Sequence, residues 1–159
     1  MNYYKVAGAL LLAACGILMT LVLNRRADRS LSQLDGWIAL LRYVRAQVDC
    51  FSLPMAEILS RGDEALLRSC GYEGGAPPRS FDDLLSACPI RDEETRRILW
   101  GFADAFGRGY REEQLKRCDY DCALLCGRRE ALAAKLPERK KLNATLCVCG
   151  VLMLALLLL

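Results

Sequence analysis

The sequence predicts an all-α protein: a helical bundle domain flanked by an amino-terminal and a carboxy-terminal transmembrane helix. Two observations carry this prediction. Apolar residues make up 53% of the 159 residues and gather at the two ends of the chain. Between these ends, apolar side chains recur at the three-and-four spacing of helices, and signals for strands are weak.

Each end of the chain carries an uncharged apolar segment long enough for a membrane helix. Residues 6–23 read VAGALLLAACGILMTLVL, and residues 142–159 read LNATLCVCGVLMLALLLL. As a helix, either segment is about 27 Å long, close to the roughly 30 Å of a bilayer's hydrocarbon core. A cleaved signal peptide is the alternative for the first segment, but Asn24, Arg25 and Arg26 follow it in place of a small-residue cleavage site. A buried core helix is the alternative for the second, which has no polar face.

Charged residues beside these segments predict the orientation of the chain. Because basic residues stay on the cytoplasmic side of a membrane, the domain of residues 24–141 is expected in the cytoplasm between two anchors. A reducing compartment also fits the nine cysteines, whose number is odd and whose spacing is irregular. The basic residues that flank the membrane are Arg25, Arg26, Arg29, Arg139, Lys140 and Lys141.

The first helix of this domain is predicted to continue out of the membrane. From Leu31 to Val48, apolar side chains recur every three or four residues and therefore share one face. Leu53-Pro54 interrupts this pattern. Ser52 is the predicted N-cap of a short helix that continues through Leu59.

Polar residues mark the beginnings of three further helices. Asp63 is expected to cap a helix of one or two turns, Ser80 with Asp83 resembles a capping box, and Asp92 opens a longer helix. The Gly- and Pro-rich residues 71–80 read as a loop. On the longer helix, one side is apolar: Ile98, Leu99, Phe102, Ala105 and Phe106.

The last helix of the domain is predicted to begin near Tyr110 or Arg111 and to continue for about 25 residues. Pro137 is expected to kink the chain before the second anchor. Trp37 and Trp100 are expected in the core or in grooves of the bundle rather than in a ligand cage.

Composition argues against most enzyme classes. The chain has no histidine, so the commonest general base and the histidine-dependent nucleophile pairs are missing. The sequence has no Gly-rich phosphate loop, and its acidic run Asp92, Glu93 and Glu94 offsets a helix macrodipole more simply than it forms a catalytic cluster. A net charge of +3 with scattered arginines does not suit nucleic acid. We therefore expect no enzymatic activity, no cofactor and no nucleic-acid partner.

Three cysteines recur every four residues in the last helix, at Cys118, Cys122 and Cys126. Their thiols fall roughly on one side, but a metal site would need a fourth ligand. Free cysteine also behaves as a small apolar residue, and this spacing continues the apolar stripe of the helix. We predict that these residues pack in the bundle. A membrane-tethered thiol or metal sensor is the alternative.

The order of segments and several short motifs resemble the stage III sporulation protein AB family of endospore-forming bacteria. The motifs are Leu53-Pro54 before Ala56-Glu57, Ser80-Phe81 at the start of a short helix, and Phe106-Gly107 followed by Arg111-Glu112 and Gln114. The chain departs from the family at four positions. Tyr110 stands where the family usually has Asp, Glu113 stands where it usually has Gly, and Cys147 and Cys149 stand where small Gly residues are common.

The resemblance implies a non-enzymatic platform in the outer forespore membrane, with its domain in the mother-cell cytoplasm. It also implies partners: the other subunits of a secretion-like channel complex that links mother cell and forespore, and a cytoplasmic secretion-type ATPase. The domain is similar to the cytoplasmic domain of the type II secretion platform protein. A general two-anchor membrane adaptor outside sporulation is an alternative.

A cluster of polar residues at one helix junction is the expected partner contact. It comprises Arg108, Arg111, Glu112, Glu113 and Gln114. Solvation of a helix start is an equally simple explanation of these charges.

Overall fold

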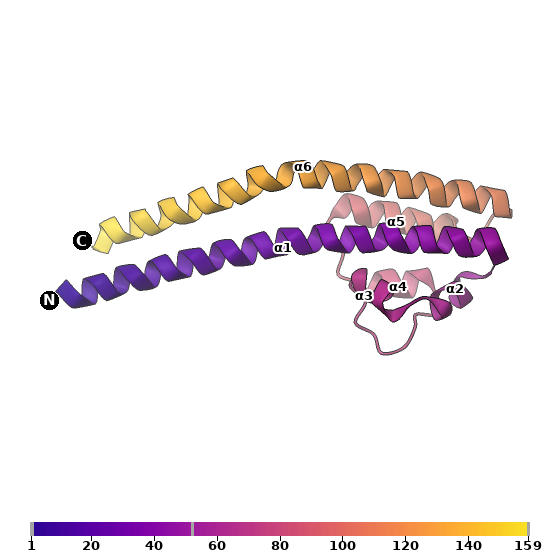
Figure 1. Ribbon diagram of the computed structural model, residues 1–159, viewed down its shortest axis with the longest axis horizontal. Helices are drawn as coiled ribbons and strands as arrows, with labels where there is room; N and C mark the ends of the chain where they lie inside the picture. Colours follow the sequence, from indigo (N-terminus) through magenta and orange to yellow (C-terminus); the bar gives the residue numbers. More distant parts are fainter. Residues whose placement is uncertain (1, 52, 159) are drawn as a thin grey trace. The chain divides into compact units, whose positions relative to one another are not determined.

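The computed structural model describes residues 2–51 and 53–158, with side chains at residues 8, 11, 14–51, 53–150, 152 and 153. All regular secondary structure in these residues is helical, which confirms the predicted all-α class. In chain order the helices are α1 (Asn2–Phe51), α2 (Met55–Arg61), α3 (Glu64–Ser69), α4 (Phe81–Ala87), α5 (Glu93–Ala105) and α6 (Arg111–Leu158) (Figure 1).

The chain divides into two compact units, both of which contain parts of α1 and α6. The bundle unit is Ser30–Leu132, and the paired-helix unit consists of Met1–Arg29 with Ala133–Leu159. The bundle unit therefore lies inside the predicted domain of residues 24–141. The two long helices enter and leave it, and the four short helices lie within it.

The core of the bundle unit is built on the face of α1 that the periodicity predicts. Its side chains from Leu34 to Val48 at the three-and-four spacing are buried. Trp37 is fully buried, with its ring 6.0 Å from that of Phe81 on α4, and Phe81 lies 5.1 Å from Phe102 on α5. These edge-to-face contacts join three helices through one row of aromatic rings.

Close packing of backbones holds α3 against α1. Gly36 of α1 is buried, and a Cβ atom at this position would lie 2.5 Å from the backbone carbonyl of Ser69. A side chain would therefore push the two helices apart.

Side-chain caps begin three of the short helices where the sequence predicts them. Asp63 accepts a hydrogen bond from the Ala65 N–H at 3.1 Å, and Ser80 accepts one from the Asp83 N–H at 3.0 Å. Asp92 accepts one from the Thr95 N–H at 2.9 Å. Pro54 occupies the N-cap position of α2, and Ser52, the residue predicted there, lies outside the described residues.

Two expectations about the later helices need correction. Trp100 is 42% exposed, because Leu99 and Phe102 occupy the inward positions of α5. The last helix begins at Arg111 as predicted, but it continues to Leu158 rather than for about 25 residues. Pro137, where a kink is predicted, lies inside α6, and the helix continues past it.

In the paired-helix unit, the beginning of α1 and the end of α6 lie side by side. Lys140 of α6 and Asp28 of α1 form an ion pair with 2.8 Å between Nζ and Oδ1. The predicted spans 6–23 and 142–159 lie in part outside the residues whose side chains are described. Over the described residues, no helix carries an apolar stretch long enough to cross a membrane.

Candidate partner-binding surface

The predicted contact residues lie around the turn that joins α5 to α6 in the bundle unit. Helix α5 ends at Ala105, and Gly107 then adopts a positive φ of 85°, a conformation that costs glycine little. Glu113 accepts a hydrogen bond from the Tyr110 N–H at 3.3 Å, and the Gln114 side-chain amide donates to the Gly109 carbonyl at 2.9 Å. Glu113 and Gln114 therefore hold this turn in place.

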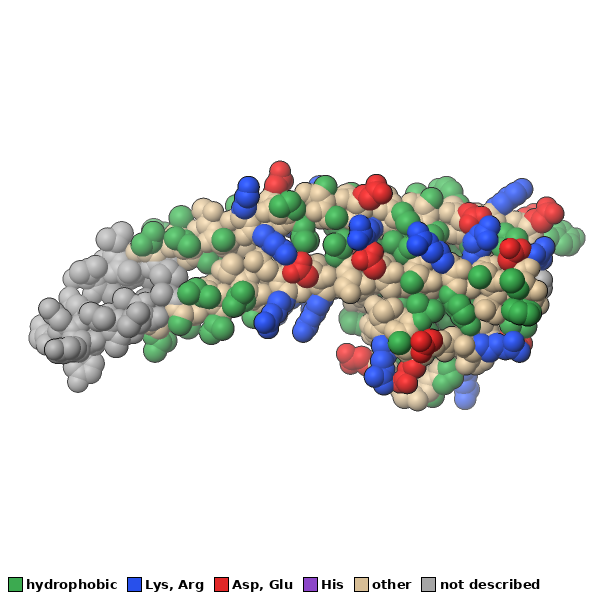
Figure 2. All heavy atoms as spheres, viewed as in Figure 1, with side chains coloured by type: hydrophobic (Ala, Val, Ile, Leu, Met, Phe, Trp, Pro, Cys, Tyr) green, Lys and Arg blue, Asp and Glu red, His purple; other side chains and the backbone are tan. Residues whose placement is uncertain are grey.

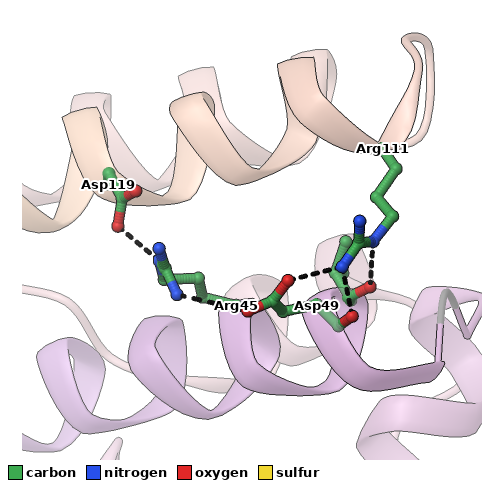
Figure 3. Close-up of polar contacts among 5 residues, drawn as sticks. Arg45, Asp49, Arg111 and Asp119 are labelled. Carbon is green, nitrogen blue, oxygen red and sulfur yellow. Dashed lines mark hydrogen bonds and ion pairs between the residues drawn. The ribbon is translucent and has the colours of Figure 1, made fainter.

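Arg111 reaches across the bundle to the end of α1 (Figure 3). Its Nε donates to the Val48 carbonyl at 3.4 Å, and its Nη2 lies 2.5 Å from Asp49 Oδ1. Nη2 also donates to the Asp49 backbone carbonyl. The last carbonyls of a helix have no partner within the helix, so the guanidinium of Arg111 caps the carboxyl end of α1.

Further charges extend this contact along the same two helices (Figure 3). Arg45 Nε lies 2.5 Å from Asp119 Oδ1 on α6, and Arg45 Nη1 lies 3.9 Å from Asp49 Oδ2. Arg111, Asp49, Arg45 and Asp119 thus form a row of alternating charge between α1 and α6. Sequence patterns do not reveal the two links of this row between α1 and α6, because the partners in each link are more than sixty residues apart.

Arg108 and Glu112 are the members of the predicted cluster whose side chains neither hold the turn nor reach α1 in the described structure. Arg108 forms an exposed ion pair with Asp104 on the preceding turn, with 2.5 Å between Nη2 and Oδ1. Glu112 is exposed, and no cation of the described residues forms an ion pair with it. These two side chains are available to a partner, whereas Arg111, Glu113 and Gln114 have structural roles.

An open groove of about 420 Å³ lies beside this turn. It forms where the ends of α1, α2, α5 and α6 meet, a junction that periodicity along one helix does not reveal. Its walls are mostly apolar, with two polar side chains that already donate to the protein's own carbonyls. The walls include Val48, Leu53, Met55, Phe106, Arg111 and Gln114.

A partly buried ion pair joins α6 to the start of α5. It lies at the end of the bundle unit that contains Ser30 and Leu132. Arg128 Nη2 lies 2.7 Å from Asp92 Oδ1, and Arg128 Nε donates to Asp92 Oδ2 at 3.0 Å. Arg128 Nη1 also lies 2.5 Å from Glu94 Oε2. The guanidinium holds the pKa of the Asp92 carboxyl well below its usual range, although desolvation acts in the opposite direction.

The three cysteines of α6 line the interior to different degrees. Cys118 is fully buried, and Cys122 and Cys126 are partly buried against the core. Burial raises the pKa of the Cys118 thiol to about 12 and also raises that of Cys122, so both are held as thiols. Across the described residues, no group of three or more cysteine, aspartate or glutamate side chains could hold a metal ion.

The six basic residues predicted at the membrane boundary all belong to the paired-helix unit. Lys140 is partly buried in its ion pair with Asp28. The other five are exposed: Arg25, Arg26, Arg29, Arg139 and Lys141.

The chemistry available at the α5–α6 turn is that of binding. The groove offers apolar walls, and Arg108 and Glu112, which follow the lining residues Gly107 and Arg111 in the sequence, are exposed. Comparison of the chain with family models, with curated proteins and with solved structures finds no match.

Proposed function

We propose that the protein is a non-enzymatic membrane scaffold, anchored at both ends, whose bundle unit docks a soluble partner in the cytoplasm. The observation that carries this proposal is the surface of the paired-helix unit. Ile17 and Leu18 of α1 are 63% and 61% exposed, and Leu146 and Met153 of α6 are 62% and 69% exposed. Figure 2 shows green apolar side chains on both helices in this part. Apolar exposure on this scale marks a surface that lipid or another protein covers.

Sequence and charge support the choice of lipid. The segments 6–23 and 142–159 contain no charged residue, and basic residues gather at the inner end of each. Anionic lipid headgroups attract such residues, and the same residues favour a cytoplasmic location for the bundle unit.

We further propose that this scaffold belongs to the sporulation channel complex between mother cell and forespore, in the outer forespore membrane. The support is the resemblance carried by Phe106-Gly107, Arg111-Glu112 and Gln114, residues that lie together at the α5–α6 turn. The partner to be docked is then the secretion-type ATPase of that complex. Two anchors restrict the orientation of the domain, and tethering raises the effective concentration of partners without tight individual contacts.

The test is to solubilise the full-length protein from sporulating cells in mild detergent and to identify the co-purifying subunits. We expect the secretion-type ATPase and membrane subunits of the channel. Arg108→Glu and Glu112→Lys should weaken ATPase recovery, because they reverse charges of the proposed contact. Both variants should remain folded, since neither side chain holds the bundle together. Glu130→Lys changes an exposed acid elsewhere on α6 and should leave recovery unchanged.

Two results would count against the proposal. Recovery of the ATPase at the wild-type level from both charge-reversed variants would place its contact elsewhere on the bundle. Absence of any channel subunit from the solubilised wild-type protein would refute the scaffold function.

A further inference from the structure

We infer that the paired-helix unit binds one anionic phospholipid at a fixed site, with an acyl chain in a groove between α1 and α6 and its phosphate beside Arg25 and Lys141. This inference rests on the proposed membrane location of the unit and names a ligand for it.

The groove between the two helices of this unit, here called the α1–α6 groove, is apolar. Its volume is about 430 Å³, within the roughly 300–1,000 Å³ of typical small-molecule sites. The Thr20 hydroxyl donates to the Gly16 carbonyl at 2.9 Å and therefore does not require a polar ligand. The lining includes Ile17, Thr20 and Leu21 of α1 and Ala144, Val148 and Leu152 of α6.

The size of the α1–α6 groove suits a hydrocarbon chain. Its lining on α6 extends over eight residues from Ala144 to Leu152, about 12 Å along the helix. A membrane helix with its side chains is about 10–12 Å across and would lie over a hollow of this volume rather than in it. An acyl chain is thinner and can bury its length there.

Basic side chains lie next to the inner end of the α1–α6 groove on both helices. Arg25 follows the lining residue Leu21 by four positions, and Lys141 precedes Ala144 by three. Helix geometry therefore places each about one turn from the lining. Both side chains are exposed, and neither forms an ion pair with another residue of the described structure.

The charge of the whole paired-helix unit has the same sign. Its eight basic residues stand against two acids, a net side-chain charge of +6, whereas the bundle unit has 14 basic and 17 acidic residues. Of the two acids, Asp28 is paired with Lys140, and Glu138 lies one turn beyond Lys141, further from the groove. Both helices continue through residues 24–29 and 135–141, so no helix end adds a dipole here.

The site is thus apolar over one stretch and basic in the next turn, which identifies the chemistry of its occupant. A second apolar helix would cover the groove but would leave Arg25 and Lys141 without a counter-charge. An anionic phospholipid supplies both an apolar chain and a phosphate in one molecule, and basic pockets between membrane helices bind such headgroups.

The experiment uses the full-length protein in nanodiscs of phosphatidylcholine that contain a small fraction of a photoactivatable lipid. The probe is phosphatidylglycerol with a diazirine in one acyl chain, and phosphatidylcholine with the same chain is the reference. Mass spectrometry of the digested protein locates the cross-links. The ratio of groove labelling by the two lipids measures the preference for an anionic headgroup.

We expect the phosphatidylglycerol probe to label Ile17, Leu21 and Val148 at least fivefold more than the reference does. Unlabelled phosphatidylglycerol should compete with this labelling, and unlabelled phosphatidylcholine should not. This pattern would support both the location of the chain and the charge of the headgroup.

Charge variants test the proposed phosphate contacts. Arg25→Gln and Lys141→Gln should each lower the labelling ratio about threefold or more, because each removes one cation beside the groove. The matched control Lys135→Gln removes an exposed cation about 14 Å from Ala144 along α6 and should leave the ratio unchanged.

A pair of phenylalanine variants tests the acyl-chain contact. Ala144→Phe places a large side chain in the groove and should reduce labelling of Ile17 and Leu21 at least threefold. Leu146→Phe changes an exposed residue that does not line the groove and should leave the labelling unchanged.

Several results would overturn the lipid site. Equal labelling by the two lipids would remove the preference for an anion, and labelling spread evenly over all exposed apolar residues would remove the groove. Arg139 lies five residues before Ala144 and so on the far side of α6. A loss in Arg139→Gln as large as that in Lys141→Gln would show a diffuse charged surface. An unlabelled groove in a dimeric protein would assign it to a second copy.

Membrane insertion is measured separately, by alkaline carbonate extraction of cell membranes. A protein that resists extraction but shows no preference in the groove would refute the lipid site and leave the scaffold function standing. Release by carbonate would refute the membrane anchors and the lipid site with them.

Discussion

Arg111 and Asp49 join the first turn of α6 to the last turn of α1, with 2.5 Å between Nη2 and Oδ1. This ion pair changes the interpretation of Arg111. The charge cluster in the sequence places Arg111 at a partner surface, but its guanidinium holds the two long helices together at one end of the bundle unit. Loss of a partner in an Arg111 variant would therefore report on folding as well as on binding.

We predict that Arg111→Ala destabilises the protein by about 1–2 kcal/mol, because it removes an ion pair and the cap on the carbonyls of α1. The measurement is thermal unfolding of the full-length protein in detergent, followed by far-ultraviolet circular dichroism. Arg108→Ala is the matched control, since its ion pair with Asp104 is exposed and should contribute at most about 0.5 kcal/mol. Equal effects of the two substitutions would contradict a structural role for Arg111.

A second prediction concerns the close approach of α1 to α3. Gly36→Ala should destabilise the bundle unit by about 1–3 kcal/mol, because the new methyl group would overlap the Ser69 backbone. Gly127→Ala should instead stabilise α6 by about 0.5–1 kcal/mol, since nothing lies within 4 Å of that position. Chemical denaturation should show a lower free energy of unfolding than wild type for Gly36→Ala and a higher one for Gly127→Ala. Stabilisation by Gly36→Ala would show that the two helices are further apart.

The pH dependence of stability should report the ion pair of Asp92 and Arg128. The pKa of Asp92 is held well below its usual range, chiefly by the hydrogen bonds from Arg128. The stability that this carboxylate contributes is therefore fully present at neutral pH, above the unfolded pKa of about 3.9, and is lost as the pH falls towards the folded pKa.

Asp92→Asn isolates this charge, because asparagine can still cap α5. We expect a loss of about 1–2 kcal/mol at pH 7 and a smaller difference from wild type below about pH 4. Glu93→Gln removes an exposed acid in the same turn and serves as the control. A pH-independent difference between Asp92→Asn and wild type would mean that the charge of Asp92 is not the cause.

Local chemistry explains which parts of the fold the sequence predicts well. Asp63, Ser80 and Asp92 cap helices because a short polar side chain can bond to an N–H two or three residues further along. The stripe from Leu34 to Val48 is buried because helix geometry alone places it on one face. Trp100 departs from the prediction because its aromatic character does not specify which face of α5 turns inward.

The candidate surface was predictable only in its location. A turn between two helices follows from Gly107 and Gly109, but the roles of the charged residues depend on a helix end more than sixty residues away. The groove likewise depends on how four helix ends meet. Such contacts are set by tertiary packing, which hydrophobic periodicity constrains only through the buried face.

The cysteines of α6 provide a further prediction. Replacement of Cys118, Cys122 and Cys126 by alanine should cost about 1 kcal/mol per site or less, with the largest loss at the fully buried Cys118. Unfolding curves of the three single variants and the triple variant test this order. Recovery of the proposed partners should survive wherever the fold does. About one equivalent of zinc bound to the wild-type protein, or loss of function in a well-folded triple variant, would favour a thiol or metal sensor instead.

The last prediction concerns topology, and the different exposure of Cys50 and Cys88 makes it testable. Cys50 is exposed at the end of α1, whereas Cys88 is 5% exposed and burial raises the pKa of its thiol to about 11. If the basic flanks keep the bundle unit in the cytoplasm, a membrane-impermeant maleimide should label neither residue in intact cells. Permeabilisation should expose Cys50 to rapid labelling, while Cys88 should react only after denaturation because a protonated, buried thiol is a poor nucleophile. Variants that retain only one of these cysteines assign the signals. Labelling of Cys50 in intact cells would place the bundle unit outside the cytoplasm, and with it any partner that the groove beside the α5–α6 turn could bind.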